Sequence, residues 1–149
     1  MDITTVELQD AKKVKTVDHG GQENGWLMEL FKDKETGTKT EVYLSAALPG
    51  AFKGYHLHRV RAARYVALKG KMKIITYTRE GDKWTRSENI LEAGQNKRLF
   101  IPKNVATGLE NIGDEEAWLI NYPDPAYDPY LKDEQVEYSQ EELEQGIVK

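Results

Sequence analysis

The stretch that decides the fold is Pro49-Gly50-Ala51-Phe52-Lys53-Gly54-Tyr55-His56-Leu57-His58-Arg59. It holds two of the chain's three histidines, His56 and His58, which are one residue apart. In an extended strand, residues i and i+2 project from the same face, so both imidazoles enter one space. Such a pair is compatible with a metal site, an acid/base site, or a buried polar pair whose hydrogen bonds are satisfied.

Short stretches rich in β-forming residues lie on both sides of this strand, with turn sequences between them. We expect strands at 6–8, 14–17, 26–31, 40–47, 64–68, 72–78, 84–87, 98–101, 108–112 and 117–122. Many short strands at regular spacing are typical of an all-β sandwich or barrel. Beyond Pro123 the sequence becomes an irregular acidic tail, in which Ser139-Gln140-Glu141-Glu142 is a capping-box pattern. It predicts a short C-terminal helix that ends near Gly146.

The composition limits the class of protein. A chain of 149 residues is long enough to bury a core, and we expect one domain over residues 1–149. The net charge of −4 argues against general binding to nucleic acid, and the lack of cysteine excludes disulfides and thiolate chemistry. No apolar leader or membrane-length segment is apparent, so we expect a cytoplasmic protein that does not bind membranes.

Charge is distributed unevenly along the chain. Residues 53–73 contain seven lysines and arginines and no acid, whereas residues 128–149 contain seven acids and two lysines. A basic excess around the histidine pair indicates an anionic ligand such as a phosphate or carboxylate. A solvated strand face explains the same pattern equally well.

The histidine stretch resembles the first motif of the cupin β-barrels, G-x5-H-x-H-x3,4-E-x6-G. Gly50, His56, His58 and Gly70 lie at the family spacing, and Ala63 stands where the motif has glutamate. The second cupin motif, P-x-G-x2-H-x3-N, is similar to residues 102–111, in which threonine replaces histidine. The resemblance implies a cupin jelly-roll barrel that lacks two of the four metal ligands. Two imidazoles alone hold a divalent ion poorly, so we expect no metal and no cofactor.

Acid/base chemistry without a metal is then the natural use of the pair. Histidine carries protons near neutral pH. A positive neighbour can stabilise an enolate formed beside a carbonyl, and Arg64 on the next strand is a candidate for that role. Lys53 lies three residues before His56 on the same strand. It therefore points to the opposite face unless Gly54 forms a bulge.

A closer resemblance is to the dTDP-4-dehydrorhamnose 3,5-epimerases and the related dTDP-sugar 3,4-ketoisomerases. Gly25-Trp26-Leu27-Met28-Glu29-Leu30-Phe31 resembles their R-G-F-F-x-E segment, and Lys53-Gly54-Tyr55-His56 resembles R-G-L-H, in which the histidine is the base. Asn96-Lys97-Arg98-Leu99-Phe100-Ile101-Pro102 is similar to N-K-R-Q-L-x-I-P, and residues 119–127 occupy the place of L-Y-K-x-x-D-Y-Y. The second histidine matches the ketoisomerases better.

The chain also departs from this group. Asn24 replaces a nucleotide-binding arginine, Thr107 replaces a histidine, and Ile120 stands near the general-acid tyrosine, for which Tyr122 is the nearest replacement. We expect the chain to be too short to include the late aspartate that pairs with the base histidine in full-length epimerases.

The resemblance implies a metal-free epimerase or ketoisomerase acting on a nucleotide-linked 4-keto-6-deoxysugar, with His56 as the base. His58 would orient His56 or return the proton, Arg64 would stabilise the enolate, and Tyr122 would donate a proton. Six further residues are assigned to binding the nucleotide-diphosphate-sugar substrate: Glu29, Lys53, Arg98, Asn24, Thr107 and Asn121. The alternatives are a non-catalytic sugar- or nucleotide-binding cupin and a metal-dependent cupin dioxygenase.

The resemblance also implies an assembly. In this family the early strands commonly complete the partner's sheet, and residues 6–17 lie outside the motif-bearing barrel. We therefore expect a homodimer.

Overall fold

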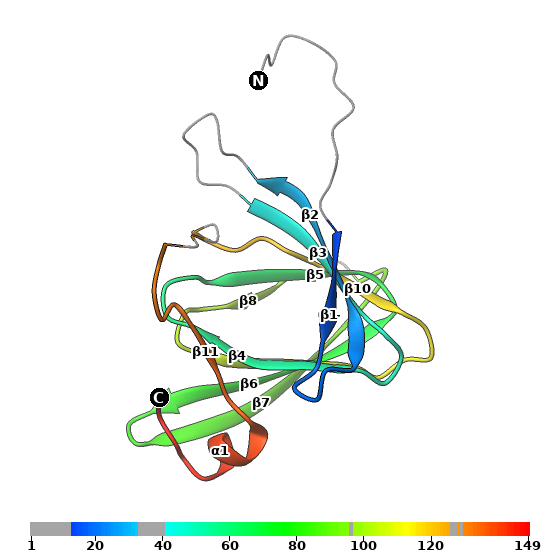
Figure 1. The fold of residues 1–149 in the computed structure, drawn as a ribbon. Coiled ribbons are helices and arrows are strands. Elements are labelled where there is room, and N and C mark those ends of the chain that lie inside the picture. The colour runs from blue at the N-terminus through cyan, green and yellow to red at the C-terminus, as the bar shows by residue number, and fades with distance from the viewer. Residues whose placement is uncertain (1–12, 33–40, 96, 126–127, 129) are drawn as a thin grey trace.

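The computed structural model describes residues 13–32, 41–95, 97–125, 128 and 130–149, and it consists almost entirely of antiparallel β-structure (Figure 1). The first sheet has six strands in the order β1-β2-β3-β10-β5-β8, and the second has five in the order β11-β4-β9-β6-β7. The strands of the first sheet are β1 (Lys13–Val17), β2 (Glu23–Lys32), β3 (Glu41–Ala47), β10 (Ala117–Asn121), β5 (Ala63–Lys69) and β8 (Leu99–Ile101). Those of the second are β11 (Gln135–Glu137), β4 (Phe52–His58), β9 (Ala106–Asn111), β6 (Lys71–Glu80) and β7 (Lys83–Glu92).

Two facing antiparallel sheets confirm the all-β jelly-roll expected from the strand pattern. Neighbours within each sheet come from distant parts of the sequence, as where β10 lies between β3 and β5. The histidine strand is β4, as predicted. The strand expected at 6–8 lies outside the described residues, and the strand expected at 84–87 extends to Glu92.

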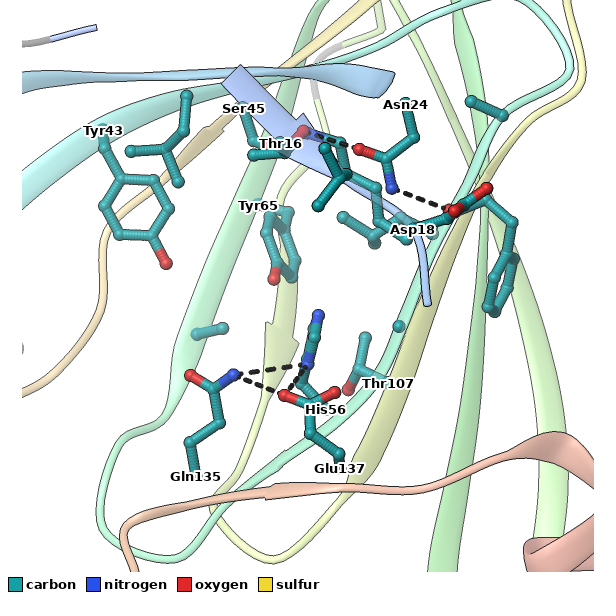
Figure 2. A pocket seen from close by; sticks show the side chains of 18 of the residues that line it. Thr16, Asp18, Asn24, Tyr43, Ser45, His56, Tyr65, Thr107, Gln135 and Glu137 are labelled. Atoms are coloured by element: carbon teal, nitrogen blue, oxygen red, sulfur yellow. Dashed lines mark hydrogen bonds and ion pairs between the residues drawn. The ribbon is translucent and has the colours of Figure 1, made fainter. Parts of the chain in front are cut away.

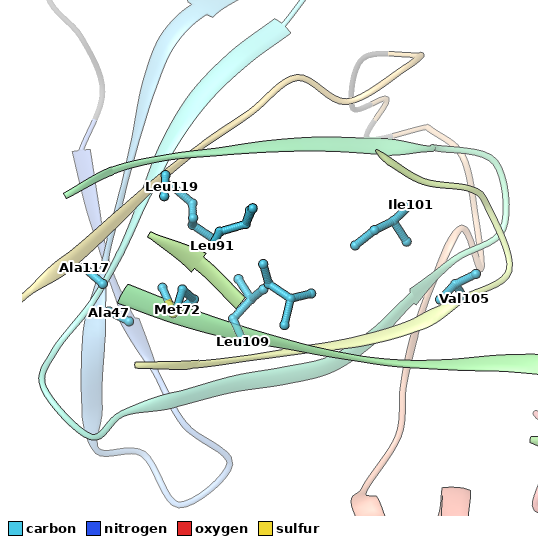
Figure 3. Packing of buried hydrophobic residues seen from close by; sticks show 10 residues of the cluster. Ala47, Met72, Leu91, Ile101, Val105, Leu109, Ala117 and Leu119 are labelled. Atoms are coloured by element: carbon cyan, nitrogen blue, oxygen red, sulfur yellow. The ribbon is translucent and has the colours of Figure 1, made fainter. Parts of the chain in front are cut away.

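The core fills part of the space between the sheets (Figure 3). Along β3 the inward positions change from Ala47, which is fully buried in the core, to Ser45, Tyr43 and Glu41. The same change occurs along β5, from Ala67 in the core to Tyr65 and Ala63. One end of the inner layer is therefore closed by apolar packing, and the other end is left to polar side chains.

Residues 130–149 of the tail contain more regular structure than their composition suggests. Its segment β11 pairs with β4, and the helix α1 (Gln140–Glu144) begins with the predicted capping box, in which Ser139 and Glu142 bond reciprocally. Tyr138 and Leu143 are each 2% exposed and pack on the outer face of the second sheet. This apolar anchoring fixes the position of β11 beside the histidine strand. Within the described residues, no helix has the length and apolar character needed to cross a bilayer.

Candidate active site

A cavity of about 1370 Å³ opens between the two sheets at their polar end (Figure 2). Both histidines of the H-x-H pair line it, together with Lys53, Arg61 and Glu137. The third histidine, His19, also reaches this cavity from the loop between β1 and β2, where its Nε2 lies 3.2 Å from the Gly54 carbonyl oxygen. All three histidines of the chain therefore face one space.

His56 is held by a carboxylate from the C-terminal tail. Its Nδ1 lies 2.7 Å from Glu137 Oε1, and β11 pairs Glu137 directly with His56. Gln135 Nε2 donates to the same carboxylate oxygen at 2.7 Å (Figure 2). Burial raises the pKa of the Glu137 carboxyl, but the hydrogen bonds from His56 and Gln135 outweigh burial and the pKa is lowered. Glu137 is thus an anion that holds one imidazole nitrogen and leaves Nε2 as a proton acceptor.

His58 has a different environment, formed by a buried ion pair. The guanidinium of Arg61 donates through Nε to Glu134 Oε1, and Arg61 and Glu134 are each 7% exposed. His58 Nδ1 lies 2.9 Å from Arg61 Nη2 and 3.2 Å from Glu134 Oε2. Burial and the charge of Arg61 lower the pKa of His58 to about 4. The His58 imidazole is therefore neutral at neutral pH.

Lys53 lines the cavity because the strand bulges at Gly54. The pairing of β4 with β9 shifts between Lys53 and His56, and Gly54 has a φ of 129°. Without a bulge, Lys53 and His56 would project from opposite faces of the strand. The bulge at Gly54 places Lys53 on the same face as His56, as the sequence analysis allowed. The ammonium donates to the Trp26 carbonyl oxygen and to Ser45 Oγ, both at 3.3 Å. Burial lowers the pKa of Lys53 to about 8, so the ammonium is protonated in most molecules at neutral pH.

Two tyrosines, Tyr43 on β3 and Tyr65 on β5, line the cavity from the first sheet, opposite the histidine strand (Figure 2). Burial raises the pKa of both hydroxyls. Tyr43 oxygen also accepts a hydrogen bond of 2.7 Å from Asn121 Nδ2. Both hydroxyls stay protonated at neutral pH and can donate a proton or a hydrogen bond.

Five of the six residues expected to bind substrate line the cavity or contact a residue that lines it. Glu29, Asn24 and Thr107 line the cavity with Lys53. Asn24 links three strands of the cavity wall. Its side chain accepts a hydrogen bond from Thr16 Oγ1 on β1 and donates one to the Phe52 carbonyl oxygen on β4. Thr107 lies beside His56 in the β4–β9 ladder. Asn121 is not a lining residue but positions one, through its bond to Tyr43.

Three expected site residues lie elsewhere. Arg64 and Tyr122 project from the outer face of the first sheet, where the Arg64 guanidinium lies 3.5 Å from Asp124 and over the rings of Phe100 and Tyr122. On β5 the inward positions are Ala63 and Tyr65, so Arg64 between them must point outward. Arg98 is exposed and does not line the cavity. The roles expected for Arg64, Tyr122 and Arg98 do not match these positions.

The donor set does not fit a cupin metal centre. Ala63 and Thr107 occupy the third and fourth ligand positions of the cupin motifs, and both line the cavity. A methyl group cannot ligate, and the Arg61 guanidinium beside His58 opposes a cation. Across the residues that the structure describes, no group of three or more histidine, cysteine, aspartate or glutamate side chains is placed to hold an ion.

Several residues in or beside the cavity escaped the sequence analysis, above all Glu137 and Arg61, which line it, and Glu134, which pairs with Arg61. Glu137 supplies the carboxylate partner of His56 that was not expected in this chain, and it is a glutamate of the tail in place of an aspartate. A signal was present, since Val136 and Tyr138 alternate with Gln135 and Glu137, the period of a strand. Tyr43 likewise shares a strand face with Ser45, which the alternation along β3 could have indicated.

A model of the polysaccharide biosynthesis C-terminal domain matches residues 20–135, which is most of the chain. The chain belongs to this family. Among curated relatives, it is 26% identical over 130 residues to the spore coat polysaccharide biosynthesis protein SpsL of Bacillus subtilis, covering 84% of this chain and 86% of that protein. It is 28% identical to a probable low-salt glycan biosynthesis epimerase of Haloferax volcanii, with 83% of each protein covered.

Solved structures share the fold. CapF with the inhibitor 3-isopropenyl-tropolone superposes with a TM-score of 0.67 and 21% identity over 84% of this chain and 34% of that one. CapF from Staphylococcus aureus, described as a capsular polysaccharide assembling protein, gives 0.65 and 20% over 84% and 31%. Oxalate oxidase with glycolate gives 0.60 and 18% over 74% and 53%. The chain thus spans about a third of the length of CapF, and these neighbours confirm the cupin jelly-roll.

Proposed function

We propose that this protein is a sugar epimerase that inverts a carbon next to a ketone. The observation that carries the proposal is the His56–Glu137 pair, which presents an imidazole nitrogen to a cavity between the sheets. An imidazole held by a carboxylate is a suitable base for a weakly acidic C–H group. Membership in a polysaccharide biosynthesis family and the relative named as a glycan biosynthesis epimerase support the same reaction class.

In this reaction His56 Nε2 removes the proton from the carbon α to the ketone. The C–H electrons form a carbon–carbon double bond, and the carbonyl electrons move to oxygen to give an enolate. A second group then delivers a proton to the opposite face of the same carbon, which restores the ketone with inverted configuration. The protein must therefore place an acid across the cavity from His56, and the proton held by His56 exchanges with solvent before the next turnover.

Tyr43 is the acid in this proposal. It lies on the sheet opposite His56, and its raised pKa keeps the hydroxyl protonated. When its proton is given up, the hydrogen bond from Asn121 Nδ2 stabilises the phenolate. This assigns Asn121 a positioning role and leaves Tyr122 outside the reaction.

The substrate class in this proposal is a nucleotide-linked 4-keto-6-deoxysugar, as for the epimerases that the sequence resembles. A cavity of about 1370 Å³ is large enough for the sugar and part of the diphosphate. The ammonium of Lys53 and the imidazole of His19 on the cavity wall supply donors for an anionic ligand. Glu29 lines the same cavity and can accept hydrogen bonds from sugar hydroxyls.

The test is proton NMR in deuterated water with a panel of nucleotide-linked 4-keto-6-deoxysugars. The wild-type protein should replace the α-hydrogen with deuterium and convert one epimer into the other. His56→Asn should slow this exchange by roughly 10²–10⁴-fold, the usual contribution of a positioned base. Tyr43→Phe should exchange deuterium but lose inversion, and Tyr130→Phe is the matched control because Tyr130 is 90% exposed.

Circular dichroism must be unchanged in each variant for the comparison to count. Exchange at the wild-type rate in His56→Asn would overturn the proposal. Saturable binding of a sugar nucleotide with no exchange in the wild type would identify a non-catalytic sugar-binding cupin instead. A product in which the ketone has moved to the neighbouring carbon would assign the protein to the ketoisomerases.

A further inference from the structure

The two histidines of the H-x-H pair have opposite hydrogen-bonding partners, although both line the same cavity. His56 Nδ1 faces a carboxylate, Glu137, which can only accept when ionised. His58 Nδ1 lies nearest to the guanidinium of Arg61, which can only donate. These partners fix different tautomers in the two rings.

In His56, the 2.7 Å contact to Glu137 Oε1 requires a proton on Nδ1. Gln135 Nε2 lies farther away, at 3.3 Å, and its shorter bond of 2.7 Å is to Glu137. Because a neutral imidazole carries one N–H, the Nε2 atom of His56 has a free lone pair. This nitrogen accepts a proton.

In His58 the same argument gives the reverse result. Arg61 Nη2 lies 2.9 Å from His58 Nδ1, whereas the two Glu134 oxygens lie at 3.2 and 3.3 Å. A proton on Nδ1 would face a guanidinium N–H at hydrogen-bond distance, which is repulsive. The Nδ1 atom therefore accepts from Arg61 Nη2, while the Nε group of the same guanidinium donates to Glu134 Oε1. The single proton of neutral His58 lies on Nε2.

We propose that His58 Nε2–H is the donor that binds the ketone oxygen of the substrate and the enolate oxygen formed from it. This inference rests on the proposed epimerase function and adds the group that stabilises its intermediate. His56 and His58 are two residues apart on β4, so their Cα atoms are separated by about 6.6 Å. An α-hydrogen and a carbonyl oxygen sit on adjacent carbon atoms, and a base and a donor with this separation can reach both at once.

A neutral donor suits this task because it is fixed before the reaction begins. The Arg61–Glu134 ion pair holds the ring from behind, and burial keeps the imidazole uncharged. The donor therefore needs no reorganisation as charge develops on oxygen, which is when its bond becomes stronger. His58 thus has the enolate-stabilising role that the sequence analysis gave to Arg64, which lies on the outer face of the first sheet.

The first measurement is the tautomer itself, read from ¹⁵N chemical shifts and two-bond couplings in protein labelled at histidine. His58→Gln assigns the signal. We expect the Nε2–H form of His58 between pH 6 and 8, and the Nδ1–H tautomer in the neutral ring of His56. In Arg61→Met, His58 should change toward the Nδ1–H form that donates to Glu134. An Nδ1–H or cationic His58 in the wild type would overturn the inference without substrate being present.

The second measurement is kinetic. His58→Leu should lower kcat by roughly 10²–10³-fold with little change in KM, as expected for a lost oxyanion donor. His58→Gln should recover part of that loss, because the glutamine amide nitrogen reaches about the same place as imidazole Nε2. Equal loss in both variants, or wild-type kcat in His58→Leu, would contradict the role. If the wild type converts no keto sugar at all, the proposed function fails, whereas the NMR result still decides the tautomer.

Discussion

His56 Nδ1 lies 2.7 Å from Glu137 Oε1, although 81 residues separate them in the sequence. The contact exists because β11 adds to the edge of the second sheet beside β4. The packing of Tyr138 and Leu143 against that sheet holds β11 in place. Apolar burial in the tail thus fixes a polar contact in the cavity.

Glu137→Gln should therefore abolish most of the activity. A glutamine amide can donate to Nδ1, which would move the imidazole proton to Nε2 and remove the base. We expect deuterium exchange into the substrate to fall by roughly 10²–10⁴-fold. Glu137→Asp, which keeps the charge, should lose less. Glu80→Gln at the exposed end of β6 is the matched control, and equal rates in the control and Glu137→Gln would contradict this role.

The strand pattern of the sequence was sufficient for the fold, because alternation in a two-layer β-protein records which side chains face inward. It also placed His56 and His58 on one face, and it allowed for Lys53 through a bulge at Gly54. Arg64 was assigned to the site because it lies on the next strand after the histidine strand. Its neighbour Tyr65 faces the cavity, so Arg64 itself faces outward. Correct use of the period along β5 would have sent Arg64 outward.

The pairing of the tail strand β11 with β4 could not be predicted from the alternation of side chains. Glu137 reaches the cavity, and Glu134 reaches Arg61 beside it, only because the tail returns to the edge of a sheet, a tertiary event with no local sign beyond a short alternation. The sequence beyond Pro123 indicated an irregular acidic tail with a short helix near its end. The ion pair between Arg61 and Glu134 shows that part of this acidity is buried beside the basic stretch.

Gly54→Ala should destabilise the protein and displace Lys53. A Cβ at position 54 would meet the Thr107 carbonyl oxygen at 2.7 Å and Gly108 Cα at 2.9 Å, both backbone atoms of β9, and a φ of 129° is itself strained for alanine. We expect a loss of about 2–4 kcal/mol in the free energy of unfolding, measured in urea. Gly81→Ala is the control, because its φ is also positive but no atom lies within 4 Å of the added Cβ. A similar loss in both variants would show that the contact with β9 is unimportant.

His58 should make the protein less stable in mild acid. Its pKa is lowered from 6.5 to about 4 in the folded state, by burial first and by Arg61 second. Between these values the unfolded chain binds a proton that the folded chain does not, so the free energy of unfolding falls as the pH falls through this window. The full shift corresponds to about 3 kcal/mol at most. His58→Gln should lack this part of the loss, and parallel stability curves for the two proteins from pH 7 to 4 would contradict the assignment.

The outer face of the first sheet carries a row of apolar side chains. Met28, Leu44, Ile120 and Val66 lie side by side on β2, β3, β10 and β5 in the observed pairing. They alternate with the residues that face the cavity and the core, so this apolar row points away from both. The helix α1 packs against the other sheet (Figure 1).

We expect this face to pair with a second copy of the chain, because Met28, Val66 and Ile120 are only partly buried in the single chain and apolar side chains are stabilised when they leave water. The wild-type protein should elute as a homodimer at micromolar concentration when mass is measured by light scattering. Ile120→Lys places a charge in the centre of the row and should give a monomer with an unchanged circular dichroism spectrum. Ile90→Lys on β7, where the side chain is 47% exposed, is the control and should remain dimeric. A monomeric wild type, or a dimer that survives Ile120→Lys, would show that the row is not the subunit interface.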